Sequence, residues 1–333
     1  MNAPASRTGP EVSALSTSLT RVLGIDLPVL GAPMGGVSGG RLAAAVSAAG
    51  GLGLIGAGYG DAQWIHGAFD DAGGAPVGIG FITWYLERHP DQLWAALEHA
   101  PAAVVLSFGD AAPHVEAIRS AGARLLMQVQ TLAEARRALA LGADAIVAQG
   151  ADGGGHGRSR GTFALVPAVA DVAGDTPVVA AGGVADGRGL AAALMLGASG
   201  VLIGTRLYAS EEALGNQDAK RALVAASGDD TVRTRVFDIV RGYDWPEGYT
   251  GRALENAFVR RWHGHEDALE QALPAERERY HEAAGQGDVT AAVVWAGEAV
   301  DTISRVEPAG AIVERMVSEA LRSLHTGPGT ADT

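Results

Sequence analysis

The chain has 333 residues, of which 47% are hydrophobic and only 5% aromatic, with 47 glycines and a formal net charge of −13. This charge disfavours nucleic acid and anionic membranes as partners, because their phosphates would repel the protein. The lack of cysteine excludes disulfides, thiolate metal sites and cysteine nucleophiles. No stretch has the roughly 18 uninterrupted apolar residues of a membrane span. Residues 1–20 lack the apolar segment of a secretory signal, so we do not expect them to be one. We expect a cytoplasmic protein with a disordered tail over residues 1–20.

From residue 27 the sequence repeats a unit of short apolar run, turn and helix-like segment. Strands are expected at residues 28–34, 52–56, 77–82, 103–108, 125–129, 145–148, 177–181 and 200–203. Helices are expected at residues 40–49, 62–72, 91–99, 113–121 and 131–141. Thr131 and Glu134 have the spacing of a capping box at the start of the last of these. The apolar runs are continuous rather than alternating, which is typical of parallel strands covered on both faces.

Eight such strands separated by helix-length segments predict a (β/α)8 TIM barrel. A doubly wound open sheet is the alternative, but no Gly-x-Gly-x-x-Gly follows the first strand to support its dinucleotide-binding form. After residue 207 the pattern changes to charged helical segments and a mixture of turn residues and aromatics. Helices are expected there at residues 211–226, 254–261, 275–284 and 306–324. We assign residues 21–225 and 300–325 to the barrel and residues 226–299 to a smaller helical cap.

The loop after the sixth predicted strand places five glycines around one histidine, His156, within residues 148–157. Such a density of glycine costs conformational entropy, so a fold tolerates it where backbone approaches another group closely. A histidine on a strand-end loop of an α/β protein is well placed for acid–base chemistry. The alternative is a flexible loop with a solvated histidine.

The loops after the last two strands are suited to a phosphate. Gly182 and Gly183 let backbone N–H groups approach an anion, and Thr205 adds a hydroxyl donor. Ordinary strand-to-helix turns are the alternative. Residues 32–36 close the first strand with an extended segment that suits the edge of a flat cofactor, or that simply forms a tight turn.

Two glutamines and two histidines need separate interpretation. Gln128 and Gln149 lie near strand ends in apolar runs, where an unpaired amide is costly. We expect them to contact a ligand or to form a hydrogen-bonded network between strands. His263 and His265 lack a third ligand at suitable spacing, so no metal site is predicted.

In this order, these segments resemble the nitronate monooxygenase family, formerly called 2-nitropropane dioxygenases. The resemblance covers residues 28–212, 250–262 and 295–313. It rests on Ala32-Pro33-Met34, on residues 149–157 with His156, on residues 180–187, and on Gly204-Thr205-Arg206. The resemblance implies a TIM barrel that holds FMN non-covalently at its mouth.

The resemblance also implies roles for individual residues. His156 matches the family's active-site histidine, which acts as base or hydrogen-bond partner toward a nitronate or nitroalkane. Two positions depart from the family pattern: Gly80 stands where many members have asparagine, and Ala151-Asp152-Gly153 replaces a common Glu-Ala. The implied cofactor contacts are Ala32, Pro33, Met34, Gly80, Gln128, Gln149, Gly154, Gly155, Gly182, Gly183, Leu202, Gly204 and Thr205.

The implied reaction is oxidation of alkyl nitronates, of the propionate 3-nitronate or nitroalkane type, with O2 to a carbonyl compound and nitrite. An NAD(P)H-dependent FMN reductase of the same barrel family is the first alternative, either an enoyl-thioester reductase or an NADH:quinone reductase. A lyase or isomerase that uses only the phosphate loops, without flavin, is the second. The expected partners are the small-molecule substrate and O2, in a monomer or homodimer.

Overall fold

Eight parallel strands form a barrel in the computed structural model, which describes residues 15–326. Neighbouring strands follow the order β1-β9-β8-β6-β5-β4-β3-β2, and a bridge between Leu30 and Leu52 closes the ring. This arrangement confirms the predicted (β/α)8 fold. The strands are β1 (Val29–Gly31), β2 (Leu54–Gly56), β3 (Gly78–Ile82), β4 (Ala103–Ser107), β5 (Arg124–Val129), β6 (Ala145–Gln149), β8 (Val178–Ala181) and β9 (Gly200–Ile203).

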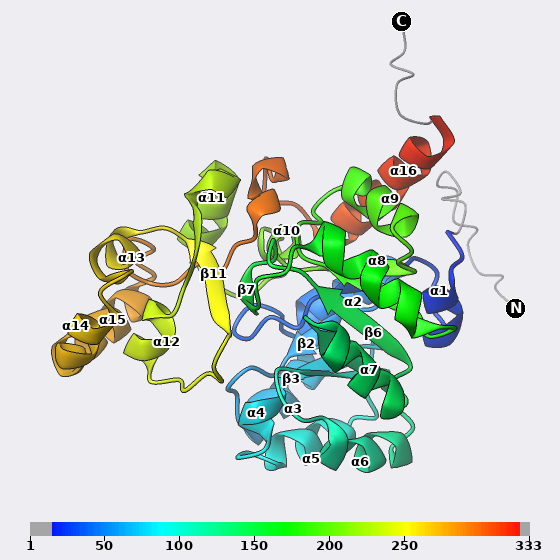
Figure 1. Cartoon of the computed structure of the whole chain (residues 1–333), viewed down its shortest axis with the longest axis horizontal. Helices are drawn as coiled ribbons and strands as arrows, with labels where there is room; N and C mark the ends of the chain where they lie inside the picture. The colour runs from blue at the N-terminus through cyan, green and yellow to red at the C-terminus, as the bar shows by residue number, and fades with distance from the viewer. Residues whose placement is uncertain (1–14, 327–333) are drawn as a thin grey trace, which may run out of the picture.

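Helices surround the barrel (Figure 1). The predicted capping box is confirmed, since Thr131 accepts a hydrogen bond from the Glu134 amide and Glu134 accepts one from the Thr131 amide. The helices that follow the barrel strands or close the ring are α2 (Gly40–Ala48), α3 (Ala62–Asp71), α4 (Thr83–Leu86), α5 (Asp91–Leu97), η1 (Ala112–His114), α6 (Val115–Ser120), α7 (Leu132–Ala140), α8 (Thr162–Ala173), α9 (Gly187–Met195), α10 (Thr205–Tyr208), α11 (Gln217–Ala225) and α16 (Ala309–Thr326).

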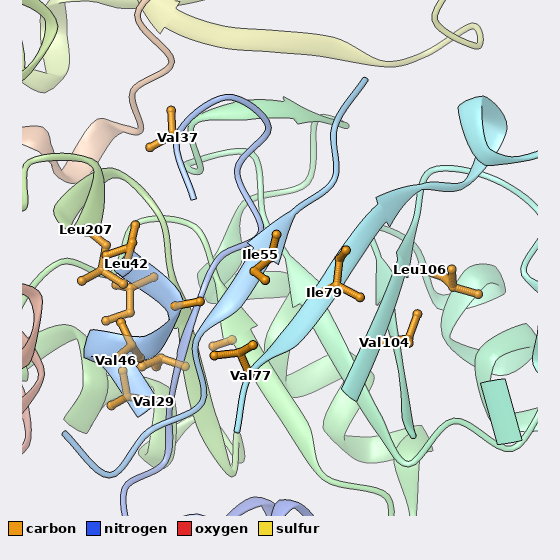
Figure 2. Close-up of a cluster of buried hydrophobic side chains, with 14 of the residues drawn as sticks. Val29, Val37, Leu42, Val46, Ile55, Val77, Ile79, Val104, Leu106 and Leu207 are labelled. Atoms are coloured by element: carbon orange, nitrogen blue, oxygen red, sulfur yellow. The ribbon is translucent and has the colours of Figure 1, made fainter. Parts of the chain in front are cut away.

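The sheet separates two layers of apolar side chains. Leu30 of β1 and Leu202 of β9 belong to the cluster that fills the barrel, whereas Val29 and Val201 beside them belong to the cluster between strands and helices. Figure 2 shows Val29 of the outer layer together with side chains of α2. Each fully buried aliphatic side chain contributes about 1.5–3 kcal/mol. Burial on both faces explains why the apolar runs are continuous.

A second, smaller sheet lies beside the barrel mouth. It has the antiparallel order β10 (Thr231–Thr234), β11 (Thr250–Leu254), β7 (Gly155–Gly157). The cap predicted as helical therefore also contains strands, which the mixed turn and aromatic pattern did not reveal. Figure 1 shows this sheet between the barrel and the cap helices. The further elements of the cap are η2 (Gly228–Asp230), α12 (Val236–Arg241), α13 (Ala257–Trp262), α14 (Glu266–Gln271), α15 (Leu273–Gln286) and η3 (Glu298–Thr302).

The strand β7 links the two parts of the chain. It lies within the segment assigned to the barrel, yet His156 pairs with Gly251 of β11 in the cap. The division at residues 226 and 299 therefore stays a prediction, because one sheet draws its strands from both sides of it.

The first helix begins within the segment that was predicted to be a disordered tail. Residues 1–14 lie outside the described part, but α1 (Ser18–Leu23) begins within the predicted tail, capped by the Thr17 side chain. Leu19 is fully buried in the inner core cluster with Leu30 and Leu126. The tail prediction is therefore wrong for residues 18–20, because burial of Leu19 against the barrel orders them. Within residues 15–326, none of the helices has the length and hydropathy needed to cross a bilayer.

Candidate active site

The residues singled out from the sequence meet at one cavity at the carboxyl ends of the barrel strands. Its volume is about 420 Å³. The sequence-predicted site residues that line it are Ala32, Pro33, Met34, Gly80, Gln128, Gln149, Gly154, Gly155, His156, Gly182, Gly183, Leu202, Gly204 and Thr205.

His156 is held by a carboxylate and by aromatic rings. Its Nε2 lies 2.9 and 3.0 Å from the two carboxylate oxygens of Asp238 on α12. The imidazole stacks on Trp245, with ring centroids 3.5 Å apart and planes 4° from parallel, and Trp295 lies 5.0 Å away. The side chains of His156 and Asp238 are only 9% and 5% exposed. The alternative of a solvated histidine on a flexible loop is therefore wrong.

Burial sets the protonation state of this histidine. Desolvation lowers the pKa of His156, and although Asp238 opposes this effect, the pKa stays below its ordinary value of 6.5. The imidazole is then neutral at neutral pH, with Nε2–H donating to the Asp238 carboxylate. No residue in the described part of the chain hydrogen-bonds Nδ1. This nitrogen is thus the atom free to accept a proton.

Two arginines of the cap hold the histidine loop. Arg233 and Arg252 each donate from Nε to the carbonyl of Ala151, at 3.3 and 3.1 Å. Arg233 also donates to the Gly157 carbonyl at 3.2 Å. Burial lowers the pKa of Arg233 to about 10, so the side chain remains charged at neutral pH. Both ends of the loop are therefore anchored to β10 and β11.

Glycines let three loops pack against one another beside the cavity. Gly182 and Gly183 have φ angles of +92° and +73°, in the left-handed region that favours glycine. A Cβ at Gly182 would lie 2.8 Å from the amide nitrogen of Gly153, and one at Gly154 would lie 2.8 Å from that of Gly297. A side chain at Gly182 or Gly154 would therefore separate the loops as well as reduce the cavity.

The two glutamines form the hydrogen-bonded network expected as one of their two interpretations, whereas their contact with a ligand stays a prediction. Gln128 donates to Oε1 of Gln149 at 3.0 Å, and both side chains line the cavity. Gln130, which the sequence did not single out, donates to the same oxygen at 2.8 Å. The amides are thus held by a network at the strand ends while remaining beside the cavity.

The two departures from the family pattern have structural reasons. A Cβ at Gly80 would lie 2.4 Å from Cγ of Pro33, so this proline occupies the space of a larger side chain. Asp152 accepts a hydrogen bond from the Thr162 amide at 2.7 Å, which ties the histidine loop to the start of α8. Asp152 therefore shapes the loop.

Sequence reasoning missed the side chains that the cap contributes. Asp238, Arg241, Trp245 and Trp295 come from this part of the chain, and the last three line the cavity. Tyr59, in the loop after β2, lines it as well. The available signal was the clustering of aromatic residues at 229–262 in a chain with 5% aromatics. That signal indicates no particular partner for His156, because Asp238 is 82 residues away in the sequence.

A parallel barrel with a ligand-sized cavity, glycine-rich loops and a buried His–Asp pair at its mouth defines a barrel enzyme that acts on a small molecule. The comparison with known families agrees with this class. The profile of the nitronate monooxygenase family matches residues 16–72 and 88–319, and the chain belongs to this family. The chain therefore belongs to a family of flavin-dependent oxidoreductases.

Individual relatives cover nearly the whole chain. The nitronate monooxygenase npaC of Metarhizium robertsii is 39% identical over 88% of this chain and 90% of its own. The structure of FabK from Thermotoga maritima is 30% identical with a TM-score of 0.81, covering 93% of this chain and 98% of that one. Nitroalkane oxidase from Streptomyces ansochromogenes is 29% identical with a TM-score of 0.78, covering 93% and 99%.

Proposed function

We propose that this protein is an FMN-dependent nitronate monooxygenase that oxidises alkyl nitronates with O2 to a carbonyl compound and nitrite. The observation that carries the proposal is the buried His156–Asp238 pair, with His156 lining the same cavity as the glycine loops. The relatives named as nitronate monooxygenases, matched over most of their length, support the same reaction.

The volume and the lining of the cavity support binding of FMN. Its volume of about 420 Å³ lies within the range of roughly 300–1,000 Å³ that is usual for ligand pockets. The segment Ala32–Met34 would lie along the ring edge, and the loops with Gly182, Gly183, Gly204 and Thr205 would bind the phosphate through backbone N–H groups and a hydroxyl. Bound FMN would accept electrons from the substrate and pass them to O2, which is the oxidant of the reaction.

The protein's own groups would prepare the substrate. Nδ1 of the neutral His156 would take the proton from the carbon that bears the nitro group, which converts a nitroalkane into its nitronate. Asp238 would keep the ring oriented and stabilise the imidazolium that forms. Stacking on Trp245 limits the movement of the ring and keeps water from it. A substrate supplied as the nitronate needs no such proton transfer.

The direct test is oxygen consumption by the purified protein with propionate 3-nitronate and with nitroalkanes, followed by measurement of nitrite. We expect yellow protein, oxygen uptake and nitrite formation. A colourless protein would contradict the flavin and favour the lyase or isomerase alternative.

A reductase of the same barrel family remains the competing function. It is tested by mixing the holoenzyme anaerobically with NADH or NADPH. Rapid bleaching of the flavin by either donor, without bleaching by propionate 3-nitronate, would contradict the monooxygenase function and support the reductase function. The expectations of a cytoplasmic location and of a monomer or homodimer stay predictions.

A further inference from the structure

Arg241 is a charged side chain at the cavity that has no partner of opposite charge in the described part of the chain. It is the last residue of α12, three positions after Asp238, and it lines the cavity half-buried. Within residues 15–326 it makes no hydrogen bond and no ion pair. Its contacts are with two aromatic rings, because the guanidinium carbon lies 4.7 Å from the ring centre of Tyr243 and 5.6 Å from that of Tyr59.

The other charged side chains near the cavity already have hydrogen-bond partners. Both oxygens of Asp238 lie within 3.0 Å of Nε2 of His156, and Arg233 and Arg252 are bound to the Ala151 carbonyl. In the described part of the chain, no aspartate or glutamate lines the cavity. A positive charge is therefore available at this cavity in a protein whose net charge is −13.

The aromatic rings hold the guanidinium in place. Tyr59 and Tyr243 are stacked with centroids 3.6 Å apart and planes 8° from parallel. The Tyr59 hydroxyl accepts a hydrogen bond at 3.0 Å from Nε1 of Trp245, the residue on which His156 stacks. A guanidinium fixed over such rings loses less freedom when it binds an anion. Its planar set of N–H donors matches a carboxylate in two-point geometry.

We propose that Arg241 is the specificity residue of this cavity and binds a carboxylate that the substrate carries apart from its reacting carbon. His156 and Arg241 line the same cavity, so one bound substrate faces both side chains. Among the substrates of the proposed function, Arg241 selects those that carry a second anionic group. This inference rests on the proposed function.

The first test measures binding of unreactive anions, so that it does not depend on turnover. Succinate stands in for a nitronate with a terminal carboxylate, and butyrate for one without it. Calorimetric titration of the holoenzyme should show succinate binding about tenfold or more tightly than butyrate, because charge-assisted hydrogen bonds are the strong ones. Arg241→Met should remove this difference while leaving butyrate binding unchanged, and Arg241→Lys should retain part of it.

Arg260→Met is the matched control. Arg260 lies on α13, is exposed and pairs only loosely with Glu255 at 3.6 Å, so this variant removes the same charge from the cap. We expect it to bind both anions as the wild type does. A loss of succinate preference in Arg260→Met would show a general charge effect and overturn the role of Arg241.

The second test measures turnover of propionate 3-nitronate and of propyl-1-nitronate. Arg241→Met should raise KM for the first about tenfold or more, with kcat little changed and the second substrate unaffected. If Arg241→Met lost activity equally with both substrates, or bound both anions more weakly to the same extent, Arg241 would only maintain the structure of the cavity. Either result would overturn the proposal. If neither nitronate is oxidised while the succinate preference depends on Arg241, the proposed function fails and the anion site stands.

Discussion

The two walls of the cavity are built from different kinds of residue. The barrel loops contribute glycines, small apolar residues and amides, such as Gly182 and Gln149, together with aromatic rings such as Tyr59. The cap contributes the charged groups, with Arg241 lining the cavity and Asp238 bound to the histidine, and further aromatic rings such as Trp245. His156 lies at the junction, on a strand that leaves the barrel and pairs with the cap.

This difference suggests a division of work. The barrel wall offers mainly backbone, whose position is fixed by the hydrogen-bonded sheet, and backbone N–H groups suit a constant cofactor. The cap wall offers side chains fixed by stacking and ion pairing, which suit proton transfer and choice of substrate. Changes in the cap should therefore alter the reaction and its specificity, and changes in the barrel loops should alter flavin binding.

The largest effect is expected from His156→Ala at the junction. Loss of the base should lower turnover of neutral nitroalkanes by about 10²–10⁴-fold, the usual contribution of a positioned acid–base group. Nitronates should suffer less, because they are already deprotonated. Oxygen consumption with both substrates and the ratio of flavin to protein check this prediction.

The control for that variant is His263→Ala, since the His263 side chain is 47% exposed on the cap. It should leave both rates unchanged. Loss of flavin in His156→Ala would contradict the separate roles of barrel and cap, because it would show that His156 is needed to bind the flavin.

Asp238→Asn tests whether the cap governs the chemistry through the histidine. The variant keeps the size of the side chain but removes the charge that stabilises the imidazolium, so nitroalkane turnover should fall by about 10²-fold, at the lower end of acid–base contributions. Flavin content should stay at the wild-type level. Asp244→Asn, at an exposed position on the same cap, is the control and should leave the steady-state kinetics unchanged. An unchanged nitroalkane rate in Asp238→Asn would show that Asp238 is only structural.

Gly182→Ala tests the barrel wall. The residue has φ +92° and an added Cβ would lie 2.8 Å from the Gly153 amide. The clash should push the two loops apart and weaken flavin binding about tenfold, while the left-handed strain of about 1–2 kcal/mol lowers stability. Gly122→Ala has similar strain, at φ +79°, with no neighbouring atom within 4 Å. Flavin titration and thermal unfolding of both variants separate the two effects. Equal flavin affinity in Gly182→Ala and Gly122→Ala would show that Gly182 does not contribute to flavin binding.

The smallest effect concerns pH. Because burial lowers the pKa of His156 below 6.5, the neutral base should persist at neutral pH and disappear as pH falls through this lowered value. The pH at which kcat/KM for nitroalkanes falls to half of its maximum should therefore lie below 6.5, while kcat/KM for nitronates should not follow this group. In Asp238→Asn the decline should move to still lower pH, since Asp238 raises the pKa. A half-maximal point above pH 6.5 would contradict the dominance of burial over the Asp238 charge.

Several parts of this protein could be predicted from the sequence because they depend on local pattern. Eight continuous apolar runs specify parallel strands covered on both faces, and such strands all end at the same mouth. The glycine loops and His156 follow from their places after those strands. The structure brings them to one cavity, as the barrel requires.

Only the tertiary structure decided what surrounds His156. The strand β7 has the sequence Gly155-His156-Gly157, which carries no apolar alternation, so its pairing with β11 leaves no sequence signal. Asp238 and Trp245 reach the imidazole because α12 and the segment after it fold over the mouth, and Leu19 is ordered because it fills the barrel core. Local sequence specifies backbone and burial, whereas contacts between distant side chains depend on how the elements pack.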